Sequence, residues 1–200
     1  MGVPSEAEVF QAHVWCDRWC ERCLLSGRCP IGRQAAIQRS ADADEPVGIS
    51  KILDRALEML EVECAKRGID PRVLPDPPTP DRVDALVERA TRWARTSQVW
   101  LATASPGEAE AVVRWYHTLV PAKLFRACSS RDLGDSDDAR GSAKVASLGL
   151  GRVVRALTEH CQVRPADRPG LELLMEACSI LQALEDAFPG HMSFRRPGLD

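Results

Sequence analysis

Apolar residues recur at three- and four-residue spacings along most of the chain, and this pattern is typical of amphipathic helices. The alternation of apolar and polar residues that would predict strands is not evident. Six helices are predicted, over residues 5–25, 49–67, 79–101, 105–120, 141–161 and 169–187. Because the pattern shows no internal repeat, we predict an all-α fold: a bundle of about six helices in a single domain, residues 1–200.

Capping patterns support several of these helix ends. Ser5 and Glu8 have the spacing of a capping box, and so do Ser105 and Glu108. Gly68 suits a helix C-terminus because glycine tolerates the left-handed conformation. Three polar stretches are read as linker, loop and flexible tail: residues 39–48, 129–140 and 189–200.

Two prolines give further information about where the helices begin and bend. Thr79-Pro80 predicts a helix start, with threonine as the cap and proline in the first turn. Pro121 predicts a kink at the end of the fourth helix, since proline removes a backbone donor and clashes with the preceding turn.

The composition is that of a soluble globular protein, with 44% hydrophobic and 28% charged residues among 200. The net charge of −3 argues against a dedicated nucleic-acid binder, which is usually basic. The first ten residues lack a signal-peptide pattern, and no apolar run reaches the ~20 residues of a membrane span. We therefore expect a cytoplasmic protein without a membrane segment, and the arginine-rich, lysine-poor composition indicates a bacterial source.

Four of the eight cysteines lie within 14 residues: Cys16, Cys20, Cys23 and Cys29. Their spacing is C-x3-C-x2-C-x5-C. Cytoplasmic thiols stay reduced, so clustered cysteines indicate metal ligands before disulfides. We therefore predict a metal-binding segment over residues 13–30.

An iron–sulfur cluster of the [4Fe–4S] type is the favoured occupant, with structural zinc and simple apolar packing as alternatives. If the first helix continued through Cys23, that residue would lie about 10.5 Å along the axis from Cys16. A single zinc ion would have difficulty reaching both, whereas a cluster spreads its ligands more widely. A helix break near Cys23 would remove this argument. Pro30 directly follows Cys29, as proline often does at iron–sulfur sites.

The C-x2-C-x5-C portion formed by Cys20, Cys23 and Cys29 resembles the cluster loop of helix–hairpin–helix DNA glycosylases. It is also similar to the iron–sulfur transcription regulators of actinobacteria and to Cas4-like nucleases. The first ligand has a different spacing in these families, so the resemblance implies a cluster and carries over no activity. The C-x3-C-x2-C portion resembles the radical S-adenosylmethionine signature, but this chain has a fourth cysteine and no β/α alternation.

The surroundings of the cysteines are basic and aromatic. The stretch from Cys16 through Arg39 contains five arginines and two acidic residues, a net charge of +3 that would stabilise an anionic cluster. Trp15 and Trp19 are expected to shield the site from water. His13 has the spacing of a packed helix-face residue, with ligation as the alternative.

A second candidate site is a pocket between the fourth and fifth predicted helices. Its catalytic candidates are Glu110, Tyr116 and His117. The other polar and aromatic residues considered there are Glu108, Trp115, Lys123, Asp137, Asp138, Ser142 and Lys144. Gly149 and Gly151 lie inside the fifth predicted helix, where glycine lowers the helix propensity. Their presence indicates that a neighbouring helix or a ligand lies very close. The remaining cysteines, expected in the core, are Cys64, Cys128, Cys161 and Cys178.

Three functions remain open. The first is an iron–sulfur protein for electron transfer, redox sensing or interaction, working with a protein or redox partner. The second is a helical-bundle enzyme with a structural cluster. The third is a zinc-stapled interaction module.

Overall fold

The computed structural model describes residues 5–41, 57–58, 61–62, 64–66, 68, 70, 84–196 and 198–200. These residues are mostly helical and include no strand, so the predicted all-α class is confirmed. Over the same residues, no helix combines the length and the apolar character needed to span a lipid bilayer.

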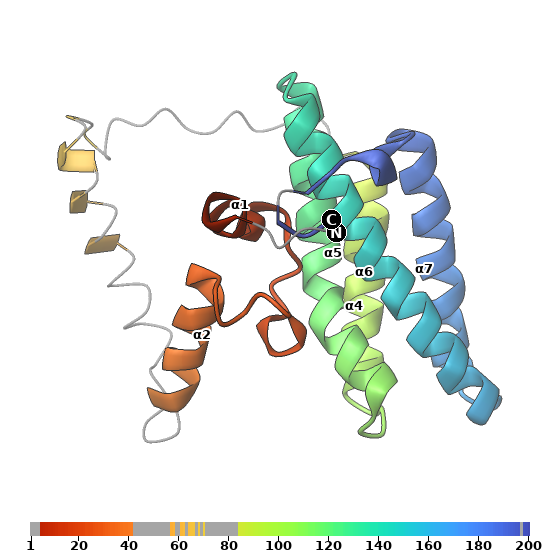
Figure 1. Cartoon of the computed structure of the whole chain (residues 1–200). Coiled ribbons are helices and arrows are strands. Elements are labelled where there is room, and N and C mark those ends of the chain that lie inside the picture. The colour runs from red at the N-terminus through yellow and green to blue at the C-terminus, as the bar shows by residue number, and fades with distance from the viewer. Residues whose placement is uncertain are drawn as a thin grey trace.

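Among the described residues, four long helices pack into a closed bundle: α4 (Ala85–Leu101), α5 (Glu108–Asp132), α6 (Ser136–Val163) and α7 (Arg168–Ala187). Each helix packs against the next, and α7 returns to α4 (Figure 1). The core is filled by fully buried side chains such as Trp93, Leu124, Leu150, Leu157 and Ile180. The expected bundle of six helices is not confirmed, because four helices form the bundle among the described residues and the short α1 and α2 lie beside it.

Aspartates cap the starts of three of these helices. Asp84 accepts a hydrogen bond from the N–H of Leu86, and Asp135 and Asp167 cap α6 and α7 in the same way. The predicted loop over residues 129–140 is wrong. Only a short turn separates α5 from α6, because Gly134 adopts a left-handed φ of 78° and Asp135 immediately starts the next helix.

The predicted capping box at Ser105 is also wrong. The N-cap of α5 is Gly107, which has no side chain to cap with, and the Ser105 hydroxyl instead accepts from Arg164 at 2.7 Å. The helix continues through Pro121 to Asp132.

Two predicted features fall largely in the gaps between the described ranges. The start at Thr79-Pro80 and most of the 49–67 helix lie outside the described residues. Within that stretch, residues 57–58, 61–62 and 64–66 are helical, and Gly68 has the expected left-handed φ of 65°.

The continuous helix predicted over residues 5–25 is not formed. The capping box of Ser5 and Glu8 does start α1 (Glu6–Gln11), which passes into a 3-10 turn, η1 (Ala12–Trp15). The helix then breaks because Arg18 adopts a left-handed φ of 56°. The Asp17 carboxylate stabilises the break by accepting the N–H of Trp19 at 3.2 Å.

After this break, a second 3-10 turn, η2 (Cys20–Arg22), leads to a helix that the sequence did not predict, α2 (Pro30–Ala41). Proline at the first helical position is a common start signal. In Figure 1, α1 and α2 lie on one side of the bundle.

At the other end of the chain, residues 189–196 and 198–200 return along the bundle, where the sequence predicts a flexible tail. A third 3-10 turn, η3 (His191–Ser193), packs on α6 with His191 fully buried. The segment after η3 reaches α1, since a Cβ atom added at Gly198 would lie 2.7 Å from the carbonyl oxygen of Glu8.

Candidate metal centre

All four clustered cysteines line one small apolar cavity at the edge of the bundle: Cys16, Cys20, Cys23 and Cys29. Cys29 is buried and the other three are half-buried. The remaining wall comes from both ends of the chain and is mostly apolar, with Ala12, Leu25, Ile31 and Leu199 among its residues and with Asp17, Arg18 and Ser26 as its polar members. The cysteine residues are thus brought together, although the helix expected to carry three of them is absent.

Burial raises the pKa of the Cys16 thiol. Burial also raises the pKa of Cys20, and charge on each of the other three cysteines would raise it further. In the metal-free protein these two thiols are therefore protonated at neutral pH, and a metal that binds them displaces protons.

The break at Arg18 removes the geometric argument that a continuous helix separates Cys16 from Cys23. The thiols nevertheless do not converge on one point. Within the described ranges, no three cysteine, histidine or carboxylate side chains are close enough together to hold a metal ion as they stand.

Asp17, next to the first cysteine, joins the segment to α5 and α6. Its carboxylate accepts a hydrogen bond from the Tyr116 hydroxyl at 2.7 Å and a charged one from Arg152. Its backbone carbonyl accepts from the indole N–H of Trp115 at 2.9 Å. One residue of the cysteine segment thus makes three polar bonds to the bundle.

The protonation states of Asp17 and Tyr116 follow from their surroundings. Burial alone would raise the pKa of Asp17, but the hydrogen bonds from Tyr116 and Trp19 and the charge of Arg152 hold it below its usual range. Burial and the neighbouring carboxylate raise the pKa of Tyr116. Asp17 is therefore ionised and Tyr116 remains a hydrogen-bond donor.

Aromatic packing also holds the cysteine segment against α5. The ring of Trp19 stacks on Trp115 with centroids 5.3 Å apart and planes 15° apart. The guanidinium of Arg22 covers Trp19 at 4.0 Å and forms two hydrogen bonds to Glu108, at 2.5 and 2.8 Å. On the other side of Cys16, Lys123 donates to the carbonyl of Val14. The first cysteine is therefore held from both sides.

Trp19 also lines the cysteine cavity, as expected of a shielding side chain. Trp15 has a different environment: it packs edge-on against Phe194 at 5.4 Å and lies over Gly141, where a Cβ atom would be 2.3 Å from the indole. The side chain of His13 lies outside the described part of the structure.

A larger pocket, of about 650 Å³, adjoins the cavity. Cys16 and Cys23 line both spaces, whereas Cys20 and Cys29 line only the cavity. Four arginines and three carboxylates line the larger pocket: Arg22, Arg152, Arg195, Arg196, Glu8, Asp17 and Asp200. The surroundings of the cysteines therefore carry a small excess of positive charge.

Each of the three catalytic candidates on α5 already contacts another residue. Tyr116 is buried against Asp17, Glu110 pairs with Arg114, and the Nδ1 atom of His117 lies 2.9 Å from the carbonyl oxygen of Arg114. A groove of about 580 Å³ does open between α5 and α6, but none of the three is among the described residues that line it.

The other members of that predicted group also have specific places. Asp138 binds Arg126 and Ser130, Lys144 binds Asp200, and Ser142 is buried. Asp137 is exposed in the first turn of α6.

The four remaining cysteines only partly follow the expectation that they lie in the core. Cys64 and Cys128 are buried and Cys161 is half-buried. Cys178 is exposed on α7, so the core assignment is wrong for that residue.

Sequence reasoning missed Asp17, Arg152 and Leu199 as parts of the site. The bonds that join Asp17 to the bundle span 98, 99 and 135 positions of the chain, and nothing local in the sequence marks them. No protein-family model, curated protein or solved structure matches the chain.

Proposed function

We propose that this chain is an iron–sulfur protein that holds a [4Fe–4S] cluster on Cys16, Cys20, Cys23 and Cys29. The observation that carries the proposal is that all four residues line one apolar cavity. Cysteine thiolates are the usual ligands of such clusters. Residues 13–30 would then be the metal-binding segment, attached to the side of the helical bundle.

The ligand pattern favours a cluster over a single zinc ion. Half of the eight cysteines lie within 14 residues, and Pro30 follows the last of them, as proline often does beside the last ligand of an iron–sulfur cluster. A cluster binds each cysteine through a different iron atom and therefore accepts a wider arrangement of ligands than one zinc ion does.

The charges near the cavity support the same occupant. A cluster ligated by four thiolates is anionic, and positive side chains nearby lower the cost of holding it in a partly buried place. Arg152 and Arg195 line the adjoining pocket on the side of Cys16 and Cys23.

The position of the cavity supports a redox role. Cys16 and Cys23 line a pocket that opens to solvent, so electrons could reach a cluster there from a protein or small-molecule partner. Trp19 and the apolar cavity wall would limit the access of water, which influences the reduction potential. We therefore infer electron transfer or redox sensing as the biological task, with the helical bundle as the scaffold.

Anaerobic purification with metal and sulfide analysis tests the proposal. We expect a brown protein with four iron and four sulfide per chain, whose visible absorption is bleached by dithionite. Cys20→Ser should remove the colour and the iron. Cys178→Ser is the matched control, because that cysteine is exposed on α7 and should leave both unchanged.

Two results would contradict the proposal. A colourless protein with one zinc per chain would establish a zinc-stapled module. Wild-type protein that binds no metal after anaerobic reconstitution with iron and sulfide, while retaining its helical circular dichroism, would show that the cysteines are not cluster ligands.

A further inference from the structure

After η3 the chain passes along α6 to the cysteine cavity. We call this part the strap, and it comprises Phe194, Arg195, Arg196, Gly198, Leu199 and Asp200. The ring of Phe194 packs edge-on against Trp15, and both rings fit over Gly141. A Cβ atom at Gly141 would be 2.3 Å from Trp15 and 3.0 Å from Phe194. The absence of a side chain therefore lets the beginning of the strap lie close to α6.

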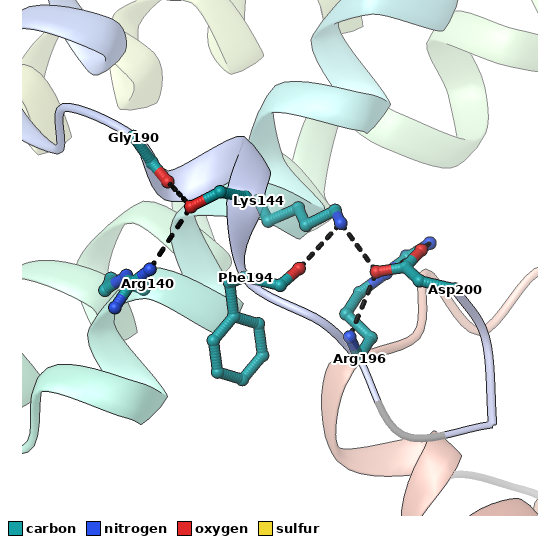
Figure 2. A network of polar contacts seen from close by, with 7 residues as sticks. Arg140, Lys144, Gly190, Phe194, Arg196 and Asp200 are labelled. Atoms are coloured by element: carbon teal, nitrogen blue, oxygen red, sulfur yellow. Dashed lines mark hydrogen bonds and ion pairs between the residues drawn. The ribbon is translucent and has the colours of Figure 1, made fainter.

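A buried ion pair holds the other end of the strap. The ammonium group of Lys144 donates to the carbonyl of Phe194 at 2.7 Å and to the carboxylate of Asp200 at 2.6 Å (Figure 2). The side chain of Lys144 is only 10% exposed. Because an unpaired buried charge is costly, this lysine strongly favours the closed position of the strap.

Asp200 has a second partner in Arg196, which donates to it from the backbone N–H at 3.0 Å and from the guanidinium at 2.7 Å. Burial alone would raise the pKa of Asp200, but the bonds from Arg196 and Lys144 lower it far more. The carboxylate therefore remains charged at physiological pH.

Between these two attachments, Gly198 lies against the backbone of α1 with a left-handed φ of 73°. Leu199, the next residue, lines the cysteine cavity together with all four cysteines and also lines the adjoining pocket. It therefore stands where the two spaces meet. Cys29, which is buried and lines only the cavity, lies on the protected side.

We propose that the strap is a lid over the cysteine cavity, with Lys144 and Asp200 as its latch, and that opening of the lid controls how fast small oxidants, chelators and thiol reagents reach the inner cysteines. This inference concerns access to the thiols and does not depend on which metal they bind. In this proposal the cysteine segment near the beginning of the chain and the strap near its end act together at one site.

Thiol labelling of the metal-free protein tests the lid. The full chain is exposed to a small maleimide, and the modification rates of Cys29 and Cys128 are followed by peptide mass spectrometry. Labelling of a protected thiol follows the population of the open state when opening and closing are fast. Cys128 lies in the bundle core, so it reports global unfolding.

Loss of the latch should raise the Cys29 rate selectively. For Lys144→Met and Asp200→Asn we expect roughly a 10- to 100-fold increase, the range that corresponds to losing a buried charged hydrogen bond. Leu199→Ala should also accelerate Cys29 while leaving the latch intact. Arg140→Gln is the matched control, because this exposed residue of α6 contacts Ser193 and takes no part in the latch.

Two outcomes would overturn the proposal. Equal Cys29 rates in the wild type, Lys144→Met and Leu199→Ala would show that the strap does not limit access. A parallel rise at Cys29 and Cys128 would show that the variants unfold the whole bundle instead of opening a lid. Since iron is absent from the assay, failure of the lid and failure of the cluster proposal give different results.

Discussion

Two glycines of α6 that are two residues apart should respond to alanine in opposite ways. Gly149 is buried against α5, and a Cβ atom there would lie 2.8 Å from Cδ1 and 3.1 Å from Cε1 of Tyr116. Gly151 is exposed, and a Cβ atom there would meet nothing within 4 Å. Only the first glycine is therefore required by the close approach of α5 and α6.

The magnitudes follow from two opposing terms. Alanine is better than glycine inside a helix by about 0.5 to 1 kcal/mol, so Gly151→Ala should stabilise the protein by up to that amount. Gly149→Ala gains the same term but forces Tyr116 to move, and overpacking of a core costs about 1 to 3 kcal/mol. The net expectation for Gly149→Ala is a loss of between about 0 and 2.5 kcal/mol.

Urea titrations followed by circular dichroism measure both effects as changes in the free energy of unfolding. In thermal melts of a chain of this size, each kcal/mol corresponds to about 2–4 °C. The double variant Gly149→Ala, Tyr116→Leu should be less destabilised than the sum of the single variants, because the shorter side chain relieves the clash. If Gly149→Ala were as stabilising as Gly151→Ala, the packing of α5 on α6 described above would be refuted.

Two further substitutions test the polar contacts. Asp17→Asn should weaken docking of the cysteine segment on the bundle, at a cost of about 1 to 3 kcal/mol for the charged hydrogen bonds to Tyr116 and Arg152. Trypsin should therefore cleave that segment faster in the variant. Unchanged cleavage would show that Asp17 does not hold the segment in place. Asp167→Asn should destabilise the bundle at neutral pH, because the carboxylate accepts from Trp100 at 3.0 Å and from His160 at 2.7 Å. Burial would raise the pKa of Asp167, but these bonds lower that pKa below the ordinary value of about 3.9. The carboxylate therefore stabilises the fold fully above about pH 3.9, and this stabilisation is lost as the pH falls through the lower pKa of the folded protein. Urea titrations from pH 7 down to about pH 2 should therefore show a smaller acid-induced loss in Asp167→Asn than in the wild type, and equal losses would refute the assignment.

The bundle helices were predictable where local signals agree. The apolar stripe over residues 169–187 gives α7 almost its full length, since periodicity is a local signal. The same reasoning failed at residues 129–140, where composition indicated a loop. There Gly134 and Asp135 compress the connection into a turn, and charged residues occupy the exposed first turn of α6.

The candidate site was predictable from sequence only in its cysteines. Their spacing indicated that they belong together, and the structure places all four at one cavity. The path of the chain between them was not predictable, because the helix break depends on the left-handed Arg18 and on bonds from Asp17 to residues about 100 positions later. Periodicity carries no information about such distant partners.

The distance along the chain between Asp17 and its partners also sets an order of events during synthesis. Trp115, Tyr116 and Arg152 follow it by 98, 99 and 135 positions. A ribosome making about 5–20 residues per second therefore exposes the cysteine segment for several seconds before its docking surface exists. Residues of the strap emerge later still, after α7. The cavity is consequently completed only after the bundle helices have been made, and a ligand that reaches the cysteines before then meets an open segment that the bundle and the strap enclose afterwards.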